Sequence, residues 1–538
     1  MNKVVWLKNL IYPKDIIGFA FWFLMGIAIT LVFYKPFEQP IHFDRAYLIY
    51  MSQVVFRGDP LYATTTYGYT PLGTILVGIF MKLGEVLSLN TIESARVIGI
   101  LLFGSICGSF YVLCKSIFTS RIAPIVACVF FTGFGYLSIL SGINAEPKLW
   151  VLFFSILGVF YFNKENWFFT GVCFSAAAMC WQVAVLSLFA CMILLPWGST
   201  RFYSNFIKLS LGVLFGTLPI LVYLSITNGW MDFWFQTVVR KLTVEGKSVG
   251  ESPTNWILRG IYPFFLLEPL HFIFSLIGFL FTSVLLFLNK WELTKHFRSV
   301  RIAKFLLVYT LIWAIFNSLE FQSSVDLFPL IPIVVIFCTY FIMSIKLNGL
   351  KKPTLIALGS ALVVYNYFDA FLYDLPFTYS EQKQIIQDVS REHGKAFVIG
   401  FEEYYTILEK PMPTKFMRYA PYEDYLIARK ENGCEEVKLF LHQGEFDQII
   451  EINRNKRKRS YHAQKVVGTM QNIFNMKDKK WKRSECSHYL IQTLTDAKES
   501  DYFKMKMQSV PLGMYFYTEE HYSIFEIQQE LKMNGMKK

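Results

Sequence analysis

Long runs of apolar residues recur over positions 1–375 of this 538-residue chain and restrict its fold more than any other feature. A helix needs about 20 mostly apolar residues to cross the hydrocarbon core of a bilayer. With 54% hydrophobic and only 17% charged residues, the chain is predicted to be a polytopic α-helical membrane protein. We expect eleven transmembrane helices, at 16–34, 94–114, 121–140, 148–163, 166–181, 183–197, 207–227, 263–289, 302–320, 327–346 and 353–373.

The basic residues indicate how these helices are oriented. No small-residue cleavage site follows the first run, which predicts a retained anchor rather than a signal peptide. Short loops on the N-terminal side of the predicted membrane carry Lys or Arg at every turn, and the positive-inside rule makes that side cytoplasmic. The net charge of +12 therefore reflects topology and does not indicate nucleic-acid binding. The basic positions are Lys115, Arg121, Lys164, Arg201, Lys208, the 290–304 cluster, Lys346, Lys351 and Lys352.

This topology requires that the apolar run 71–87 does not cross the membrane. The run is short, and Lys82 and Glu85 interrupt it, which is typical of interfacial or re-entrant segments. A large loop, 35–93, then lies on the outer side. The loops 141–147, 228–262 and 320–326 and the C-terminal segment share that side.

Residues 376–538 differ in composition from the membrane domain 1–375. Short apolar groups alternate there with charged, helix-like stretches, a pattern that predicts a small extracytoplasmic α/β domain. We expect strands at 396–400, 438–442, 448–452 and 514–518.

The cysteines divide between the two regions. Cys434 and Cys486 lie in the C-terminal segment and could form a disulfide there, since an extracytoplasmic compartment is oxidising. The other seven lie in apolar runs, where we expect small, buried thiols.

A lone acid opens the stretch HFDRAYLIYMSQVVFRGDPLY, directly after the first apolar run. On a helix that begins there, Asp44, Tyr47, Leu48 and Met51 share one face, with Arg45 beside the acid. Asp44 is expected just outside the first membrane helix, at the lipid–water boundary. A lipid-borne substrate meets a water-borne one there, so Asp44 is a candidate catalytic base. The alternative is that Asp44 is a helix N-cap.

A second acid, Glu146, lies in the short outer loop SGINAEPKLW. An acid this close to the bilayer usually faces a cavity or a partner. Together with Asp44 it could divide acid–base and binding duties. The alternatives are an ion pair with Lys148 or Arg45, or an exposed loop charge.

Several other outer residues are candidates for substrate binding. Tyr67, Tyr69 and Thr70 of YGYTPL offer rings and hydroxyls to a sugar, although an interfacial aromatic belt has the same composition. Asp326 begins a run with two prolines and either lines the cavity or caps a helix. Basic residues suit a lipid phosphate or act as interface anchors: Arg96, Arg240, Lys241, Arg259 and His271.

Common catalytic motifs of other enzyme classes do not occur. The sequence contains no Walker A motif, no HExxH, no GxSxG context and no Rossmann glycine pattern after a strand. Nucleotide-driven and zinc-hydrolase chemistry therefore lack support. No cofactor is indicated, and a divalent metal remains compatible with the candidate carboxylates.

The order of these parts resembles the GT-C superfamily of polytopic glycosyltransferases, and most of all the branch of protein O-mannosyltransferases and bacterial aminoarabinose (lipid A) transferases. The resemblance covers residues 10–375, with a weaker likeness in the C-terminal segment. The matching segments are HFDRAYLIYMSQVVFRGDPLY, YTPLGTILVGIFMKLG, SARVIGILLFGSICGSFYVLCKSIF, NAEPKLW, GVCFSAAAMCWQVAVLSLFACMILLP and DLFPLIP.

This resemblance implies an inverting transferase in the bacterial plasma (inner) membrane, with its site on the periplasmic face. Its donor would be a polyprenyl-phosphate-linked sugar, and its acceptor a glycan, a lipid or a protein. In such families the acid of the first outer loop is the candidate base, which matches Asp44. The acid of the second outer loop, a supporting or binding carboxylate, matches Glu146.

The chain departs from the family pattern at three places. Arg45 stands where the family has a second acid. Thr70-Pro71-Leu72 replaces a Lys-Pro-Pro-Leu sequence, and a lysine is also missing near Trp181. Phosphate binding is therefore expected to depend on other residues, such as Arg240 or Arg259.

Two other classes of protein predict different sequence features or different effects of mutation. A transporter or flippase of lipid-linked sugars predicts inverted repeats and charges near the centres of the spans, and neither is visible. A membrane scaffold without catalytic activity would tolerate the loss of Asp44 and Glu146 together.

Overall fold

The structure is a computed structural model. It describes residues 13–41, 43–65, 67–239, 268–288, 296–319, 324–344, 352–372, 378–393, 396–399, 402–411, 448–452, 507–514 and 518–526.

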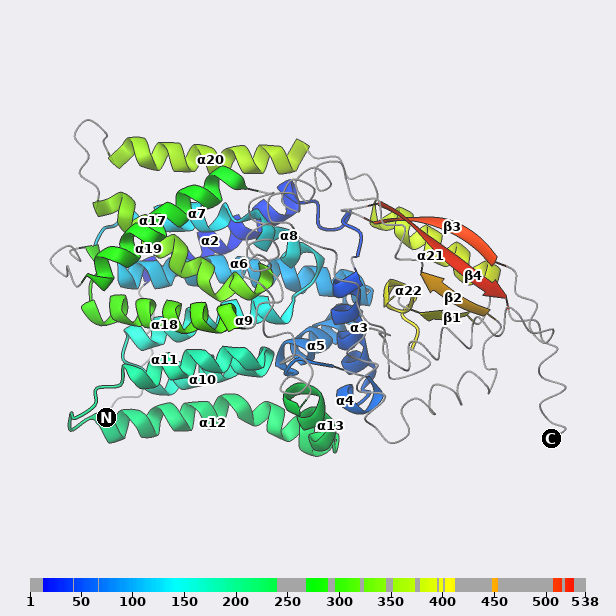
Figure 1. Ribbon diagram of the computed structural model, residues 1–538, viewed down its shortest axis with the longest axis horizontal. Helices are drawn as coiled ribbons and strands as arrows, with labels where there is room; N and C mark the ends of the chain where they lie inside the picture. The colour runs from blue at the N-terminus through cyan, green and yellow to red at the C-terminus, as the bar shows by residue number, and fades with distance from the viewer. Residues whose placement is uncertain are drawn as a thin grey trace.

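Apolar helices form a bundle in which most axes run in roughly the same direction (Figure 1). Each of the predicted apolar runs coincides with a helix or with a pair of helices. They are α2 (Pro13–Phe33), α6 (Thr91–Ile117), α7 (Ala123–Thr132) with α8 (Gly135–Ile143), α9 (Pro147–Asn163), α10 (Trp167–Cys180), η1 (Gln182–Val185) with α11 (Leu186–Ile193), α12 (Phe202–Ile226), α17 (Pro269–Phe287), α18 (Val300–Leu319), η6 (Ser324–Leu330) with α19 (Ile331–Ser344), and α20 (Lys352–Leu372).

The lengths of these helices support a polytopic membrane protein. Among the described residues, six helices are long and apolar enough to cross a bilayer, and the bent pair α7–α8 makes a seventh if it counts as one span. The apolar stretches of the remaining helices, such as Pro353–Phe368 within α20, are shorter than 18 residues. The total of eleven spans stays a prediction.

A break of 60° separates α7 from α8. The first N–H groups of a helix have no intrahelical acceptor. At the start of α8, the Glu268 carboxylate is such an acceptor and receives a hydrogen bond from the Gly135 N–H at 2.9 Å. Glu268 is almost fully buried and lies directly before α17. Glu268 was not predicted as a functional or structural residue. Its hydrogen bond stabilises the start of α8 after the break.

Glycines allow several helices to approach closely. A Cβ atom on Gly104 of α6 would lie 2.8 Å from the Phe23 carbonyl oxygen of α2, and one on Gly212 of α12 would lie 2.0 Å from the Phe168 carbonyl oxygen of α10. Small residues at such contacts give the van der Waals packing that holds helices together in a membrane.

Shorter helices gather at one end of the bundle: α3 (Phe43–Arg57), α4 (Leu61–Thr64), α5 (Leu72–Val86) and α13 (Trp230–Trp234) (Figure 1). Helix α5 corresponds to the run that was predicted not to cross the membrane. It packs on α3 through Gly78, whose Cβ position is 2.9 Å from Val55, while Lys82 and Glu85 lie on its exposed side. Its location at this end suits a non-crossing segment.

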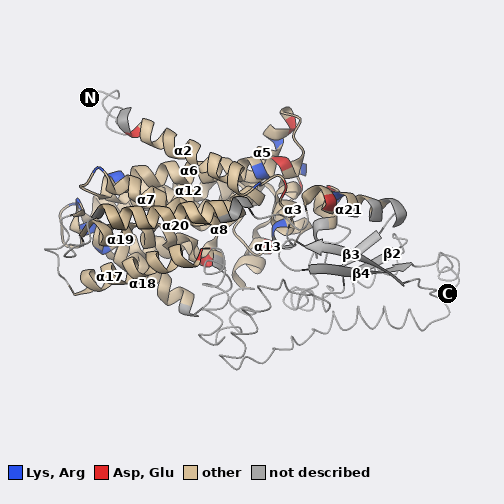
Figure 2. Cartoon of the chain, turned by 90° about the horizontal axis from the view of Figure 1, so that it is seen from above, with Lys and Arg blue, Asp and Glu red and all other residues tan. Residues whose placement is uncertain are grey.

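The opposite end of the bundle is basic. Lys and Arg residues gather there, away from α3 and the C-terminal strands (Figure 2). Arg301 is 2.6 Å from Glu165, and Arg298 donates to the Phe118 carbonyl at 2.8 Å, so three of the predicted basic loops meet. This clustering agrees with the charge pattern from which the topology was predicted.

After the bundle, the described chain contains helices α21 (Tyr379–His393) and α22 (Glu402–Ile407) and a sheet. The strands are β1 (Ala396–Ile399), β2 (Gln448–Ile452), β3 (Met507–Met514) and β4 (Thr518–Glu526), in the order β1-β2-β4-β3. Strands β1 and β2 are parallel, and β4 is antiparallel to both neighbours.

Two of the four predicted strands, 396–400 and 448–452, coincide with β1 and β2. The predicted strand 514–518 is wrong, because it covers only the last residue of β3 and the first of β4. Met514 and Thr518 are instead partners across these two antiparallel strands, and residues 515–517 lie outside the described residues. The predicted strand 438–442 lies outside the described residues.

The described cysteines are those of the apolar runs, and all are buried with free thiols, as expected. Cys434 and Cys486 lie outside the described residues, so their predicted pairing is not addressed.

Helices α21 and α22 contact the outer loop. Gln382 of α21 bonds both backbone groups of Ile41, receiving its N–H at 2.8 Å and donating to its carbonyl at 2.9 Å. Glu409, just after α22, accepts a hydrogen bond from the Thr91 hydroxyl at 2.7 Å, at the start of α6. The chain that follows the bundle therefore holds the segment around α3.

Candidate active site

Helix α3 places Asp44 at the end of the bundle. Asp44 is the second residue of this helix, as the sequence predicted, and its side chain lies outside the described part of the structure. Tyr47, Leu48 and Met51, the residues expected on the same helix face, are all buried. Every residue from 46 to 54 is buried, so this part of α3 is enclosed by the protein on all sides, and the candidate base lies in the first turn of the helix.

Arg45 and Glu146 form an ion pair. Their side chains approach to 2.7 Å and are only 11% and 4% exposed. Glu146 precedes Pro147, which begins α9, and proline is favoured at that first helical position because it has no N–H to satisfy. Of the alternatives for Glu146, pairing with Arg45 is therefore the one realised. It brings this acid to the start of the helix that carries Asp44.

Lys148, two residues after Glu146, forms a second buried ion pair. The Lys148 ammonium is 2.5 Å from an Asp326 carboxylate oxygen, with side chains 5% and 3% exposed. Lys148 is in the first turn of α9 and Asp326 in η6, so the pair links two parts of the bundle. The same ammonium lies 4.8 Å from the centre of the Trp181 ring, within cation–π range.

Tyrosines cluster beside the Lys148–Asp326 pair, where the Lys148 ammonium lies 6.0 Å from the centre of the Tyr69 ring. The Tyr67 ring is 6.3 Å from that of Tyr47, 6.0 Å from that of Tyr62 and 5.7 Å from that of Tyr69. The Tyr67 hydroxyl bonds the Thr74 hydroxyl. Burial raises the pKa of Tyr67, so this hydroxyl stays protonated and does not serve as a base.

Hydrogen bonds to the loop 67–70 fix its position. The Thr70 hydroxyl donates to the Ala178 carbonyl of α10 at 2.8 Å, and the Gln182 amide donates to the Gly68 carbonyl at 3.0 Å. The Tyr67 N–H donates to Gln236 at 2.7 Å. Thr70, a predicted substrate-binding residue, thus uses its hydroxyl to hold the loop.

Several buried polar atoms have no hydrogen-bond partner among the described residues. Four of them belong to residues close in sequence to Glu146, Lys148 or Trp181: Glu146 Oε2, Asn144 Oδ1, Trp150 Nε1 and Gln182 Oε1. Buried polar groups are satisfied in the great majority of cases, and a bound polar molecule is one way to satisfy them. Asn144, Trp150 and Gln236 were not predicted, because no local pattern distinguishes them from other loop or helix residues.

The remaining basic candidates have other roles or other places. The Arg96 guanidinium donates to the carbonyls of Pro36 at 2.8 Å and Gln39 at 2.5 Å, so it holds the backbone of the outer loop. His271 is buried and its ring Nε2 contacts the Phe130 carbonyl at 2.9 Å. Neither supports the predicted phosphate contact. Arg240, Lys241 and Arg259 lie outside the described residues.

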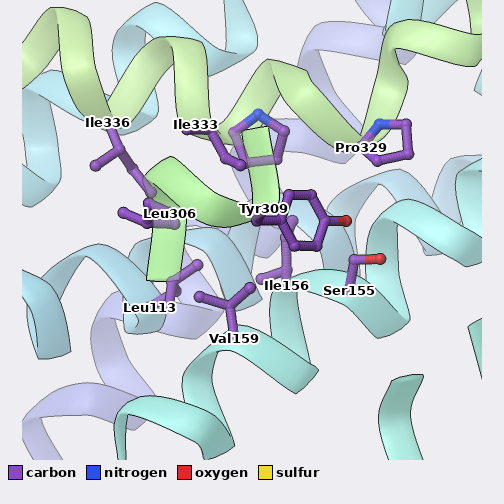
Figure 3. A pocket seen from close by; sticks show the side chains of 10 residues that line it. Leu113, Ser155, Ile156, Val159, Leu306, Tyr309, Pro329, Ile333 and Ile336 are labelled. Carbon is purple, nitrogen blue, oxygen red and sulfur yellow. The ribbon is translucent and has the colours of Figure 1, made fainter. Parts of the chain in front are cut away.

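Two negative findings concern the described residues alone. They contain no group of three or more His, Cys, Asp or Glu side chains arranged to hold a metal. A cavity of about 10 Å³ lies between α9, α18 and α19, beside Ser155 and Tyr309 (Figure 3). It has room for about one water molecule, so it does not accommodate a sugar or a lipid chain.

The long apolar helices and their arrangement support the class of polytopic membrane proteins. The structure is similar to two crystal structures of ArnT, a lipid A aminoarabinose transferase, from Cupriavidus metallidurans. The undecaprenyl phosphate complex has a TM-score of 0.53 and the apo state 0.52, each at 11% identity. The match covers 95% of this chain and 99% and 98% of those chains.

At this identity the likeness shows the fold. No protein-family model and no curated protein matches the sequence. The resemblance to GT-C glycosyltransferases predicted from the order of motifs is nevertheless confirmed by the structural match.

Proposed function

We propose that this protein is a membrane glycosyltransferase, a hexosyl- or pentosyltransferase that uses a polyprenyl-phosphate-linked sugar. The observation that carries the proposal is the buried Arg45–Glu146 ion pair at the start of the helix that bears Asp44. It brings Glu146 to the start of the helix that carries Asp44, next to the Lys148–Asp326 pair and a set of tyrosines. The likeness to ArnT, crystallised with undecaprenyl phosphate, supports a lipid-linked donor.

The orientation is part of the proposal. The basic end of the bundle (Figure 2) would face the cytoplasm, since Lys and Arg are retained on that side. The candidate site would then lie at the outer face of a bacterial plasma membrane. We propose eleven spans, with residues 376–538 forming an α/β domain outside. The acceptor would be a glycan, a lipid or a protein.

In the proposed reaction Asp44 accepts the proton of an acceptor hydroxyl. The hydroxyl oxygen forms a bond to C1 of the sugar while the bond between C1 and the phosphate oxygen breaks. The electron pair of that bond leaves with the polyprenyl phosphate. Attack from the face opposite the phosphate inverts the configuration at C1.

The other residues would bind and orient. Phosphate is a good leaving group, so a nearby positive charge is sufficient help. The charge of Lys148 is already balanced by Asp326, so Arg240 and Arg259 are the candidates for this role. Glu146, held by Arg45, would accept a hydrogen bond from a substrate hydroxyl through its second carboxylate oxygen.

A direct test uses the full-length protein in lipid nanodiscs. Undecaprenyl phosphates that carry a radiolabelled hexose or pentose serve as donors, and lipid and glycan fractions of a deletion strain serve as acceptors. We expect equal amounts of transferred sugar and released undecaprenyl phosphate. A deletion strain should accumulate the donor and lack one glycoconjugate. Donor that only changes leaflet in proteoliposomes, without cleavage, would indicate a flippase instead.

A further inference from the structure

We propose that the sugar bound at this site is uncharged and rich in hydroxyl groups. This inference rests on the proposed function and specifies its substrate class. It follows from the charges that surround the site, from the polar atoms left unpartnered there, and from the surrounding rings.

The four described charges of the site neutralise one another in pairs. Arg45 lies 2.7 Å from Glu146, and Lys148 lies 2.5 Å from Asp326. A charged group is buried at acceptable cost only when an opposite charge compensates it. A sugar with a protonated amine would need a carboxylate of its own, and a sugar acid would need a cation. Each described pair already satisfies both of its members.

The unpartnered atoms are those that hydroxyl groups recognise. Glu146 Oε2, Gln182 Oε1 and Asn144 Oδ1 are acceptors, and Trp150 Nε1 is a donor. A hydroxyl can donate to the first three and accept from the fourth. Because Arg45 already balances the Glu146 charge, the free oxygen of Glu146 offers a hydrogen bond without an excess negative charge.

Aromatic rings near these atoms suit the C–H faces of a neutral sugar. Tyr69 and Trp181 both lie near the Lys148 ammonium, at 6.0 and 4.8 Å from ring centre to nitrogen, and Tyr67 lies beside Tyr69. Rings of this kind offer a large apolar contact area to the C–H faces of a sugar.

Glu146 and Asp326 are the paired acids among the described side chains of the proposed site. The proposed function uses Asp44 as the base. A protonated amine next to it would favour its charged form and lower its pKa, because opposite charges stabilise the ionised carboxylate. Such a sugar would weaken the base that the reaction needs, whereas a neutral sugar leaves its basicity unchanged.

The experiment compares three undecaprenyl phosphate donors with the full-length protein in nanodiscs: a neutral hexose or pentose, an amino sugar with a protonated amine, and a uronic acid. The readout is the release of undecaprenyl phosphate together with sugar transfer. We expect the neutral donor to react at least about tenfold faster, a difference that charge complementarity commonly produces at close range.

A variant that removes the positive charge of Arg45 tests whether charge balance causes this preference. Arg45→Gln leaves the Glu146 carboxylate without its counter-charge, so the ratio of amino-sugar to neutral-sugar transfer should rise about tenfold. Arg57→Gln is the matched control, because Arg57 ends the same helix and pairs with the exposed Asp59. Its ratio should equal that of the wild type.

Faster transfer of the amino sugar or the uronic acid by the wild type would overturn the inference and leave the proposed function intact. An unchanged ratio in Arg45→Gln would overturn the charge-balance explanation on which the inference depends. Absence of undecaprenyl phosphate release from every donor, including a lipid extract of the deletion strain, would overturn the proposed function, and the inference with it.

Discussion

Gln53 of α3 and Thr406 of α22 are 353 positions apart in sequence and are joined by hydrogen bonds. The Gln53 amide donates to the Thr406 carbonyl at 2.9 Å and to the Thr91 hydroxyl at 2.7 Å. The Thr406 hydroxyl donates to the Ala46 carbonyl at 3.0 Å. The helix that begins at Asp44 is therefore held by α6 and by the segment after the bundle.

Gln53→Leu should lower both stability and activity. The substitution removes two buried hydrogen bonds, from the Gln53 amide to the Thr406 carbonyl and to the Thr91 hydroxyl, and each contributes about 0.5–1.5 kcal/mol. We expect a lower melting temperature in detergent and a lower kcat/KM for transfer, because α3 positions Asp44. Ser105→Ala, which removes an exposed hydroxyl bond in α6, should change neither. Wild-type melting and turnover in Gln53→Leu would show that this contact is dispensable.

The Lys148–Asp326 pair makes a different prediction, because its two charges are nearly excluded from solvent. Lys148→Met or Asp326→Leu alone removes the counter-charge of the other residue of the pair. This should lower the free energy of unfolding by about 3–5 kcal/mol. The double variant removes both charges, so it should melt at a higher temperature than either single variant. The exposed pair Lys82–Glu85 is the control, and Lys82→Met should have little effect. Additive losses in the double variant would contradict a coupled pair.

Asp44→Asn tests the proposed base directly. The amide cannot accept the proton of the acceptor hydroxyl, and loss of a general base costs about 10²–10⁴ in rate. Binding of undecaprenyl phosphate and the melting temperature should stay close to those of the wild type. Asp59→Asn makes the same exchange at an exposed position just beyond the end of α3 and should retain full activity. Full transfer by Asp44→Asn would remove Asp44 from the mechanism.

The apolar runs predicted the helices well, because hydrophobic length is a local property of the sequence. Spacing and charge also predicted that Asp44 lies at a helix start. They predicted as well that Glu146 could pair with Arg45 or Lys148. That Lys148 pairs with Asp326 could not be predicted, since the partners meet only when α9 and η6 pack together. Arg96 looked like a phosphate ligand, because sequence does not show which backbone carbonyls a buried guanidinium will reach.

Gly99 of α6 gives a prediction that separates packing from chemistry. A Cβ atom there would lie 2.1 Å from the Ser141 carbonyl oxygen and 3.0 Å from the Ala145 nitrogen, so the chain leading to Glu146 must move. Overpacking of this kind typically costs about 1–3 kcal/mol.

Gly99→Ala should therefore lower both the melting temperature and the rate of transfer per folded molecule. Gly104→Ala is the matched control, because its Cβ atom would press on the Phe23 carbonyl of α2 at 2.8 Å, away from Glu146. That variant should lose stability and keep its turnover. Thermal melting and single-turnover transfer, measured on the same nanodisc samples, distinguish the two effects. Equal losses of turnover in both variants would mean that the position of Glu146 does not limit the reaction.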